Sequence, residues 1–236
     1  MKHVEVNSEL HEKYNNYYQE PISKWRELGA KAKANNIISM AGTAKYTKVL
    51  EVGAGDGAIL KILNDKNFCT ELFALEISES GIEKIKSRNL NSLKRVLLFD
   101  GYSTSFSDKE FDLVYCSHVI EHVEHPRILL REIKRISKNQ IFEVPIDFSF
   151  SVDKKINHFL SYGHINIYTP ALFRFLLKSE GFEISRDSPK MLDREVNKYI
   201  LAEKRKQSGI LKYLAFYTKN MLVRAIWKIL PLKLKD

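Results

Sequence analysis

A glycine-rich segment that follows an apolar run is the strongest chemical signal in the sequence. It reads Val-Leu-Glu-Val-Gly-Ala-Gly-Asp-Gly over residues 49–57, and a helix is expected directly after it. Glycines permit a tight turn and let a ligand approach the backbone closely, while the first turn of a helix offers free N–H groups. Glu76 ends the next apolar run, where a carboxylate can accept hydrogen bonds from both hydroxyls of a ribose. Together these residues predict a site for a nucleoside-bearing ligand.

Two kinds of nucleoside ligand fit this loop. Gly53, Gly55 and Ala58 also match the GxGxxG/A fingerprint of dinucleotide-binding folds. Glu76 would then be the acidic residue of that fingerprint. Glu51 lies two residues before Gly53 and favours a positively charged ligand, such as a methionine ammonium or sulfonium, because a carboxylate would repel a pyrophosphate.

Three further segments extend the pattern. Asp100 and Gly101 follow a third apolar run at residues 95–99, and a carboxylate there can accept the amino group of an adenine. Residues 111–126 read Phe-Asp-Leu-Val-Tyr-Cys-Ser-His-Val-Ile-Glu-His-Val-Glu-His-Pro. Residues 163–170 read Gly-His-Ile-Asn-Ile-Tyr-Thr-Pro and lead into a helix.

This ordered set of motifs resembles the class I S-adenosylmethionine-dependent methyltransferases, in the small-molecule group that includes ubiquinone-biosynthesis methyltransferases. The resemblance spans about residues 45–203. It implies an α/β fold with a Rossmann-like seven-stranded, mostly parallel sheet, an antiparallel last strand and helices on both faces. It also implies S-adenosylmethionine as the cofactor.

The resemblance assigns roles to particular residues. The residues that it places at the cofactor are Glu51, Gly53, Ala54, Gly55, Glu76, Ile77, Asp100, Gly101 and Ser117. Glu51 is expected near the methionine amino group, Glu76 at the ribose and Asp100 at the adenine. Ser117 and His118 are expected to border the sulfonium and the methyl acceptor.

Three histidines are candidates for acid–base chemistry: His118, His158 and His164. Histidine titrates near neutrality and can take a proton from a hydroxyl as the methyl group arrives. We expect His164 and His118 to be the catalytic residues. Residues 118–122 also match HxxEH, a zinc-protease signature, but that motif requires a long helix and here it follows a predicted strand. We therefore expect no metal site.

Apolar runs alternate with helical segments along most of the chain, which predicts a parallel sheet covered on both faces. The expected strands are residues 48–52, 72–77, 95–99, 111–116 and 140–144, and the expected helices between or after them are 58–63, 80–88, 126–137 and 170–180. The runs 182–186 and 198–202 have no evident crossover helix before them, so they are expected to form a final antiparallel pair.

The chain divides into three expected parts. Residues 1–44 are expected to form lid helices at 8–20 and 23–41, with Tyr18, Lys24 or Trp25 closing over the cofactor. Residues 45–204 are the expected cofactor-binding domain. Residues 205–236 are expected to be a basic amphipathic tail.

Charge and composition limit the possible partners. The 236 residues carry a net charge of +9, but nine of the 38 basic residues and only one of the 29 acidic residues lie in 204–236, so the rest is nearly neutral. A nucleic-acid-binding face is therefore not expected. Neither a signal peptide nor a transmembrane run is evident, and the two cysteines suggest no disulfide framework, so we expect a cytoplasmic protein.

The basic tail has an amphipathic segment at residues 208–230. It can lie on an anionic membrane surface, which would make the protein peripheral at the inner membrane face. It can also lie against the domain or mediate a homodimer.

The sequence predicts methyl transfer to a small polar acceptor, and it favours oxygen over nitrogen as the methylated atom. The polar, aromatic segment 145–169 suits a saccharide, and a lipid-linked saccharide would also account for the tail. Two alternatives stay open at this point. They are a nicotinamide-dependent oxidoreductase or epimerase and a non-catalytic cofactor-binding assembly protein.

Overall fold

A computed structural model describes residues 23–148, 152, 156, 157, 159, 163–207 and 209–229, with the side chains of 227–229 excepted. The expected helix at 8–20, with Tyr18, lies outside the described residues, and so does His158.

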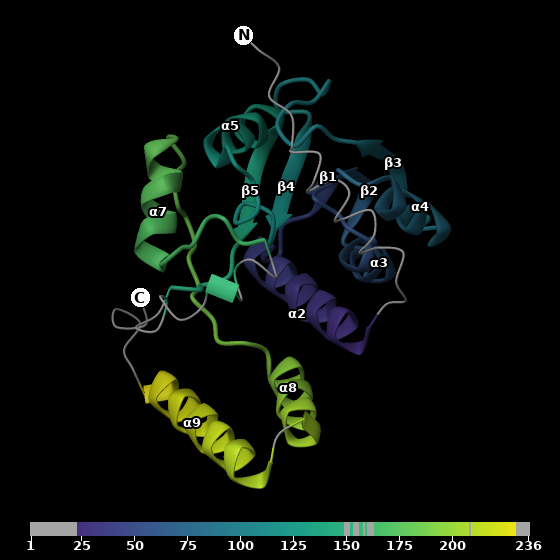
Figure 1. Ribbon diagram of the computed structural model, residues 1–236. Coiled ribbons are helices and arrows are strands. Elements are labelled where there is room, and N and C mark those ends of the chain that lie inside the picture. The colour runs from purple at the N-terminus through teal and green to yellow at the C-terminus, as the bar shows by residue number, and fades with distance from the viewer. Residues whose placement is uncertain are drawn as a thin grey trace.

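A five-stranded parallel sheet forms the centre of the described chain (Figure 1). Its strands are β1 (Tyr46–Val52), β2 (Cys69–Glu76), β3 (Leu93–Leu98), β4 (Phe111–Ser117) and β5 (Ser137–Glu143). The strand order is β3-β2-β1-β4-β5, and all four pairings are parallel. The order reverses direction between β1 and β4, and open α/β sheets bind ligands beyond the carboxyl ends of the strands at such a point.

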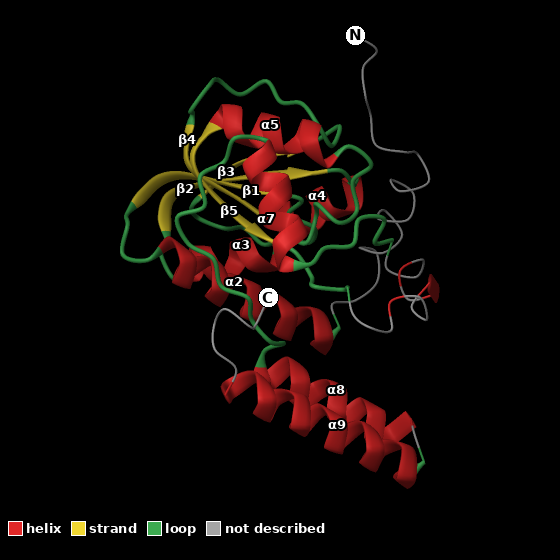
Figure 2. Cartoon of the chain, turned by 90° about the vertical axis from the view of Figure 1, so that its left-hand side faces the viewer, coloured by secondary structure: helices red, strands yellow, loops and turns green. Residues whose placement is uncertain are grey.

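Helices cover both faces of this sheet. They are α2 (Lys24–Ala41), α3 (Ala58–Asp65), α4 (Glu79–Ser87), α5 (Pro126–Ile136) and α7 (Pro170–Ser179). Two further helices, α8 (Arg194–Gln207) and α9 (Ile210–Ile229), lie apart from the sheet (Figure 1). Figure 2 shows α5 and α7 on one side of the sheet and α2 and α3 on the other. The α/β fold with a parallel sheet, expected from the alternating pattern, is thus confirmed.

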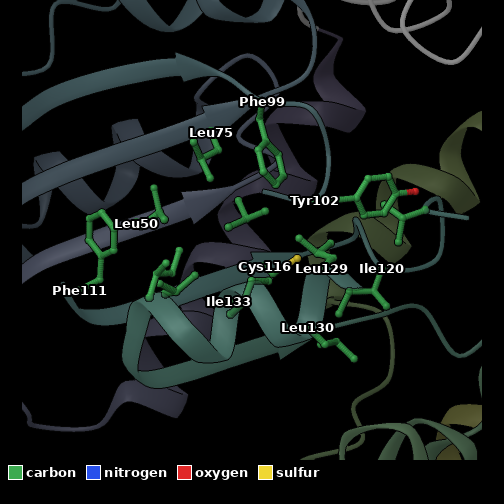
Figure 3. Packing of buried hydrophobic residues seen from close by; sticks show 14 of the residues in the cluster. Leu50, Leu75, Phe99, Tyr102, Phe111, Cys116, Ile120, Leu129, Leu130 and Ile133 are labelled. Atoms are coloured by element: carbon green, nitrogen blue, oxygen red, sulfur yellow. The ribbon is translucent and has the colours of Figure 1, made fainter. Parts of the chain in front are cut away.

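Two apolar cores lie on the two faces because successive side chains of a strand point to opposite sides. One contains Leu50, Phe111 and Cys116 of the strands together with Leu129 and Ile133 of α5 (Figure 3). The other contains the following side chains of α2, α3 and the strands: Ala34, Ile37, Leu60, Leu63, Val49, Leu72 and Leu113. The helices are therefore held by burial of apolar faces on both sides.

The connection between β3 and β4 contains no helix. Phe99, Tyr102 and Phe106 of this segment are buried in the core beneath α5. The rings of Phe106 and Phe111 meet edge to face, with their centroids 4.8 Å apart. These aromatic residues cover the sheet where a crossover helix would otherwise lie.

The expected seven-stranded sheet with an antiparallel last pair is wrong for the described residues. Residues 198–202 lie within α8, and 182–186 have no regular structure. Asp193 caps α8, because its Oδ1 accepts a hydrogen bond of 2.8 Å from the backbone N–H of Glu195. An acidic residue directly before a helical pattern is a helix-start signal that the strand interpretation overlooked.

Helix α9, within the expected tail, forms a helical hairpin with α8. Asn197 of α8 and Asn220 of α9 exchange two amide hydrogen bonds of 3.2 and 2.9 Å. Tyr199 of α8 also contacts Trp25 of α2, with ring centroids 6.4 Å apart. None of the helices in the described ranges is long and apolar enough to cross a membrane. The division at 44/45 and 204/205 into separate units stays a prediction.

Candidate functional site

The glycine loop lies at the carboxyl end of β1, where the strand order reverses. Gly53, Gly55 and Gly57 all have positive φ angles, of 74°, 56° and 74°. Glycine adopts this conformation without steric cost. A Cβ on Gly53 would also lie only 2.3 Å from Cγ2 of Val119, so the segment after β4 passes directly against the loop.

Glu76 holds the glycine loop from the end of β2. Its Oε2 accepts a hydrogen bond of 2.7 Å from the backbone N–H of Gly55. Its Oε1 accepts two more from the backbone N–H and hydroxyl of Ser78, at 3.1 and 2.9 Å. Burial raises the pKa of Glu76, while these hydrogen bonds oppose the rise. The residue expected at the ribose is thus also the residue that shapes the loop.

Glu51 is a buried carboxyl group in the middle of the site. Its Oε2 accepts a hydrogen bond of 2.7 Å from Tyr115 on the neighbouring strand β4. The pKa of Glu51 is raised to about 8, chiefly by burial and to a smaller extent by the charges of Glu76 and Asp56, while Tyr115 and Lys33 act against the rise. The site is therefore suited to a positively charged ligand, which would stabilise the ionised form of Glu51.

Replacing Glu51 with glutamine should remove a pH-dependent loss of stability. An unfolded glutamate has a pKa near 4.3, so between about pH 5 and 8 the folded protein binds one more proton than the unfolded chain. Stability then falls as pH rises through this window, by about 1.4 kcal/mol per pH unit. From about pH 5.5 to about 7.5 the wild type should lose roughly 2–3 kcal/mol relative to the variant Glu51→Gln. Urea unfolding of both proteins at the two pH values measures this difference, and parallel pH profiles would contradict it.

The residues expected at the adenine make contacts within the protein. Asp100 accepts hydrogen bonds of 2.7 Å from the backbone N–H groups of Tyr102 and Ser103. Gly101, with φ 93°, completes this turn. Ile77 lies against the core beneath α5. Their expected contacts with adenine stay predictions.

Ser117 connects β4 to β5 and to α2. Its hydroxyl donates to Oε2 of Glu143 at 2.8 Å, and Asn36 of α2 donates to the other oxygen at 2.6 Å. Lys190 in turn donates to the side-chain oxygen of Asn36 at 2.9 Å. Glu143 and Asn36 were not found from the sequence, because nothing in the local pattern shows that α2 crosses the end of β5.

An ion pair attaches α2 to the glycine loop. Arg26 Nη2 lies 2.7 Å from Oδ2 of Asp56, and both side chains are largely buried. Arg88 donates to the backbone carbonyl of Asp56 at 2.5 Å. Helix α2, for which a lid role is predicted, therefore contacts the glycine loop through this ion pair. Of the residues predicted to close over the cofactor, Trp25 contacts α8 and Lys24 pairs with Glu27 at the surface.

A cluster of histidines lies beyond the end of β4. His118 has a positive φ of 58°, and its backbone N–H donates to the carbonyl of Glu143 at 2.8 Å. Burial lowers the pKa of His118 well below its usual range, and the charges of Lys33, His122 and His164 lower it further. His118 is therefore neutral at neutral pH and can accept a proton.

Segment 163–166 brings His164 to the same place. The backbone N–H groups of Ile165 and Asn166 donate to the carbonyl of Glu121 at 2.9 and 3.0 Å. The Asn166 side chain donates to the carbonyls of Ile120 and Val123 at 3.2 and 2.7 Å. These bonds bring the two predicted catalytic histidines, His118 and His164, to one end of the sheet.

The loop and its carboxylates fit S-adenosylmethionine. The positive φ angles of the three glycines bring bare backbone to the end of β1, and buried Glu51 offers a carboxyl group that a ligand ammonium would ionise where this ammonium is expected. Glu76 is at the end of β2, one strand away. The arrangement defines a doubly wound nucleoside-binding domain whose acidic site suits a cationic ligand.

A comparison with known families gives the class of the protein. A family model described as a methyltransferase domain matches residues 12–186. The chain belongs to this family, and its domain is a class I S-adenosylmethionine-dependent methyltransferase domain with S-adenosylmethionine as the cofactor. The nicotinamide alternative is thereby disfavoured.

Similar proteins support the fold. The demethylmenaquinone methyltransferase of Thermotoga maritima is 23% identical over 189 residues, which cover 69% of this chain and 78% of that protein. A structure of a Haloferax volcanii complex between the Trm112 methyltransferase activator and a methyltransferase matches with a TM-score of 0.62 and 17% identity, over 75% of this chain and 79% of that one.

An S-adenosylmethionine-dependent methyltransferase of Aquifex aeolicus matches with a TM-score of 0.50 and 16% identity, over 65% of this chain and 81% of that one. The chain spans only 57% and 54% of the length of two curated relatives, from Bacillus subtilis and Methanocaldococcus jannaschii.

Proposed function

We propose that the protein transfers the methyl group of S-adenosylmethionine to a hydroxyl of a small polar acceptor, a sugar-like or lipid-linked saccharide intermediate. The observation that carries this proposal is the pair of histidines beyond the end of β4: His118, which is neutral at neutral pH, and His164, whose Nδ1 forms a hydrogen bond of 2.5 Å with Oδ2 of Asp147. A carboxylate that holds an imidazole in this way orients it for proton transfer. A hydroxyl must lose a proton on methylation, so a positioned base favours oxygen as the acceptor atom.

When bound, the cofactor supplies an activated methyl group on a sulfonium. The chain then has two tasks, to position the acceptor and to receive its proton. His118 follows β4 directly, and 31% of its side chain is exposed. It can therefore reach an acceptor from the end of the sheet. Its low pKa keeps a lone pair available at neutral pH.

The variant His118→Asn tests the function. Asparagine tolerates the positive φ of this position better than most residues, so the fold should be retained. Loss of a general base should lower kcat by roughly 100-fold or more, with unchanged affinity for S-adenosylhomocysteine. Transfer of isotope-labelled methyl to a panel of saccharides, lipid-linked saccharides and amines measures both rate and acceptor. Transfer to amines alone, at a rate that the variant does not change, would contradict the proposal.

The exposed face of α9 supports a membrane-bound acceptor. Ile210, Leu211 and Leu222 are 75%, 79% and 61% exposed, although α9 lies against α8. The helix contains lysine and arginine but no acidic residue. Figure 1 shows α8 and α9 apart from the sheet. We propose that α9 lies on an anionic membrane surface, since apolar and basic side chains together suit such a surface.

Charge reversal on α9 should weaken binding to anionic vesicles. Lys212 and Lys219 are exposed, and each basic residue near such a surface contributes about 1 kcal/mol. Changing both to glutamate should lower vesicle affinity by roughly tenfold or more. The variant Lys86→Glu/Lys94→Glu makes the same change in net charge on exposed residues of the domain, so it is the matched control. An equal loss of vesicle affinity in both variants would show that net charge alone acts. A stable dimer that does not bind vesicles would show that α9 packs against a second copy of the chain.

A further inference from the structure

Glu121 is the most unusual polar group among the described residues. Its side chain is fully buried, and neither carboxylate oxygen accepts a hydrogen bond from any residue that the structure describes. Burial raises the pKa of Glu121 to about 7. A buried carboxylate that accepts no hydrogen bond is costly, so it calls for a ligand.

Histidine nitrogens surround this carboxylate. Nδ1 of His118 lies 3.4 Å and Nε2 of His122 lies 3.7 Å from Oε1 of Glu121. The rings of His122 and His164 meet edge to face, with centroids 4.8 Å apart. One possible ligand atom each from Glu121, His122 and His164 lies within 4.8 Å of the other two.

Neighbouring acceptors set the tautomers of two of these histidines. Nδ1 of His122 lies 3.0 Å from the carbonyl oxygen of Gly163, which can only accept a hydrogen bond. Nδ1 of His164 lies 2.5 Å from Asp147. Both Nδ1 atoms therefore carry the proton, and the lone pairs are on the Nε2 atoms. Metal-ligating histidines show the same arrangement, with the second nitrogen donating to a carbonyl or carboxylate.

We propose that Glu121, His122 and His164 bind a divalent transition metal ion, with zinc as the best match. One carboxylate and two imidazoles are a ligand set of catalytic zinc sites that leaves a position open for a further ligand. Ligand atoms around zinc lie roughly 3.3 Å apart, so the present group needs only small side-chain movements to close on an ion. This inference differs from our sequence expectation of no metal, and it deepens the proposed function, on which its role in the reaction rests.

The ion would assign different tasks to the two predicted catalytic histidines. His164 becomes a ligand, and His118 is left to receive the proton. A Lewis acid lowers the pKa of a hydroxyl that occupies the open position. The acceptor oxygen gives its proton to His118 and forms a bond to the methyl carbon. The carbon–sulfur bond breaks with its electron pair on sulfur, so that the products are the methyl ether, neutral S-adenosylhomocysteine and one proton.

Cobalt titration tests the site without any use of activity. Wild-type protein freed of metal by a chelator should bind one equivalent of Co²⁺ with a visible absorption band, and Zn²⁺ should displace it. The variants Glu121→Gln and His122→Gln should weaken binding by about 100-fold, and Asp147→Asn by about 10-fold, since outer partners contribute less than ligands. The control His125→Gln changes a nearby histidine that contacts Tyr102 and should bind as the wild type does.

The outcomes separate this inference from the proposed function. Zn²⁺ should also raise the Tm of the wild type but not that of Glu121→Gln. A cooperative thermal transition of Glu121→Gln without metal checks that this variant is folded. No Co²⁺ binding by the wild type, or equal binding by wild type, Glu121→Gln and His122→Gln, would overturn the metal site. Metal binding together with methyl transfer to amines alone would uphold the site and contradict the proposed function.

Discussion

Replacing Glu76 with glutamine should lower the affinity for S-adenosylhomocysteine by about 100-fold, which corresponds to about 2.7 kcal/mol. Hydrogen bonds to a charged group contribute about 1.5–3 kcal/mol each, and the ribose offers two hydroxyls to this carboxylate. Glutamine has one acceptor oxygen, whereas Glu76 also accepts hydrogen bonds from Gly55 and Ser78. The variant therefore affects both the ligand and the loop. Isothermal titration calorimetry measures the change.

A control separates binding from folding. Glu79 is exposed at the start of α4, three residues further along the chain. The variant Glu79→Gln removes the same charge nearby and should bind the ligand as the wild type does. Glu76→Gln should unfold at a lower urea concentration but remain folded in its absence. Equal affinities of Glu76→Gln and Glu79→Gln for S-adenosylhomocysteine would show that Glu76 does not bind the ligand.

Two glycine-to-alanine changes in helices should have opposite effects on stability. A Cβ on Gly81 of α4 would lie 2.7 Å from the backbone oxygen of Gly55 and 2.9 Å from Cγ of Glu76. The glycine loop would have to move, so Gly81→Ala should destabilise the protein by about 3 kcal/mol, the upper end for overpacking. A Cβ on Gly29 of α2 would meet nothing within 4 Å. Gly29→Ala should therefore stabilise the protein by about 0.5–1 kcal/mol.

Urea unfolding measures the free energy of unfolding of both glycine variants, and ligand titration measures their affinities for S-adenosylhomocysteine. Because Gly81 touches the loop, its variant should also bind S-adenosylhomocysteine more weakly, whereas the variant of Gly29 should keep full affinity. Destabilisation by both changes to the same extent would show that the tight contact between α4 and the loop has no energetic importance.

Local pattern predicted most of the fold. The strands and helices around the sheet were recognisable because their apolar residues follow the period of each element, and Pro170 after Thr169 marked the start of α7. The end of the chain was misread since Tyr199 and its apolar neighbours form a short run that resembles a strand. The length of a short apolar run does not by itself distinguish a strand from part of a helix such as α8.

The candidate site was predicted only where its residues lie within continuous motifs. Glu51, Gly53 and Glu76 follow strands directly, so their positions at the carboxyl edge could be inferred. Lys33 and Glu143 approach the site through the packing of α2 over the sheet, which no local pattern encodes. Gly81 looks like an ordinary helical glycine until its distance from the loop is known, and the buried state of Glu121 depends on segment 163–166 folding over it.

Calorimetric titration of the wild-type protein with S-adenosylhomocysteine, and separately with NAD⁺, tests the central claim most directly. A cationic amino group facing Glu51 and a nucleoside at the end of β2 should give one binding site with a Kd of roughly micromolar order for the first ligand and no measurable heat for the second. Binding of NAD⁺ without binding of S-adenosylhomocysteine would contradict the account.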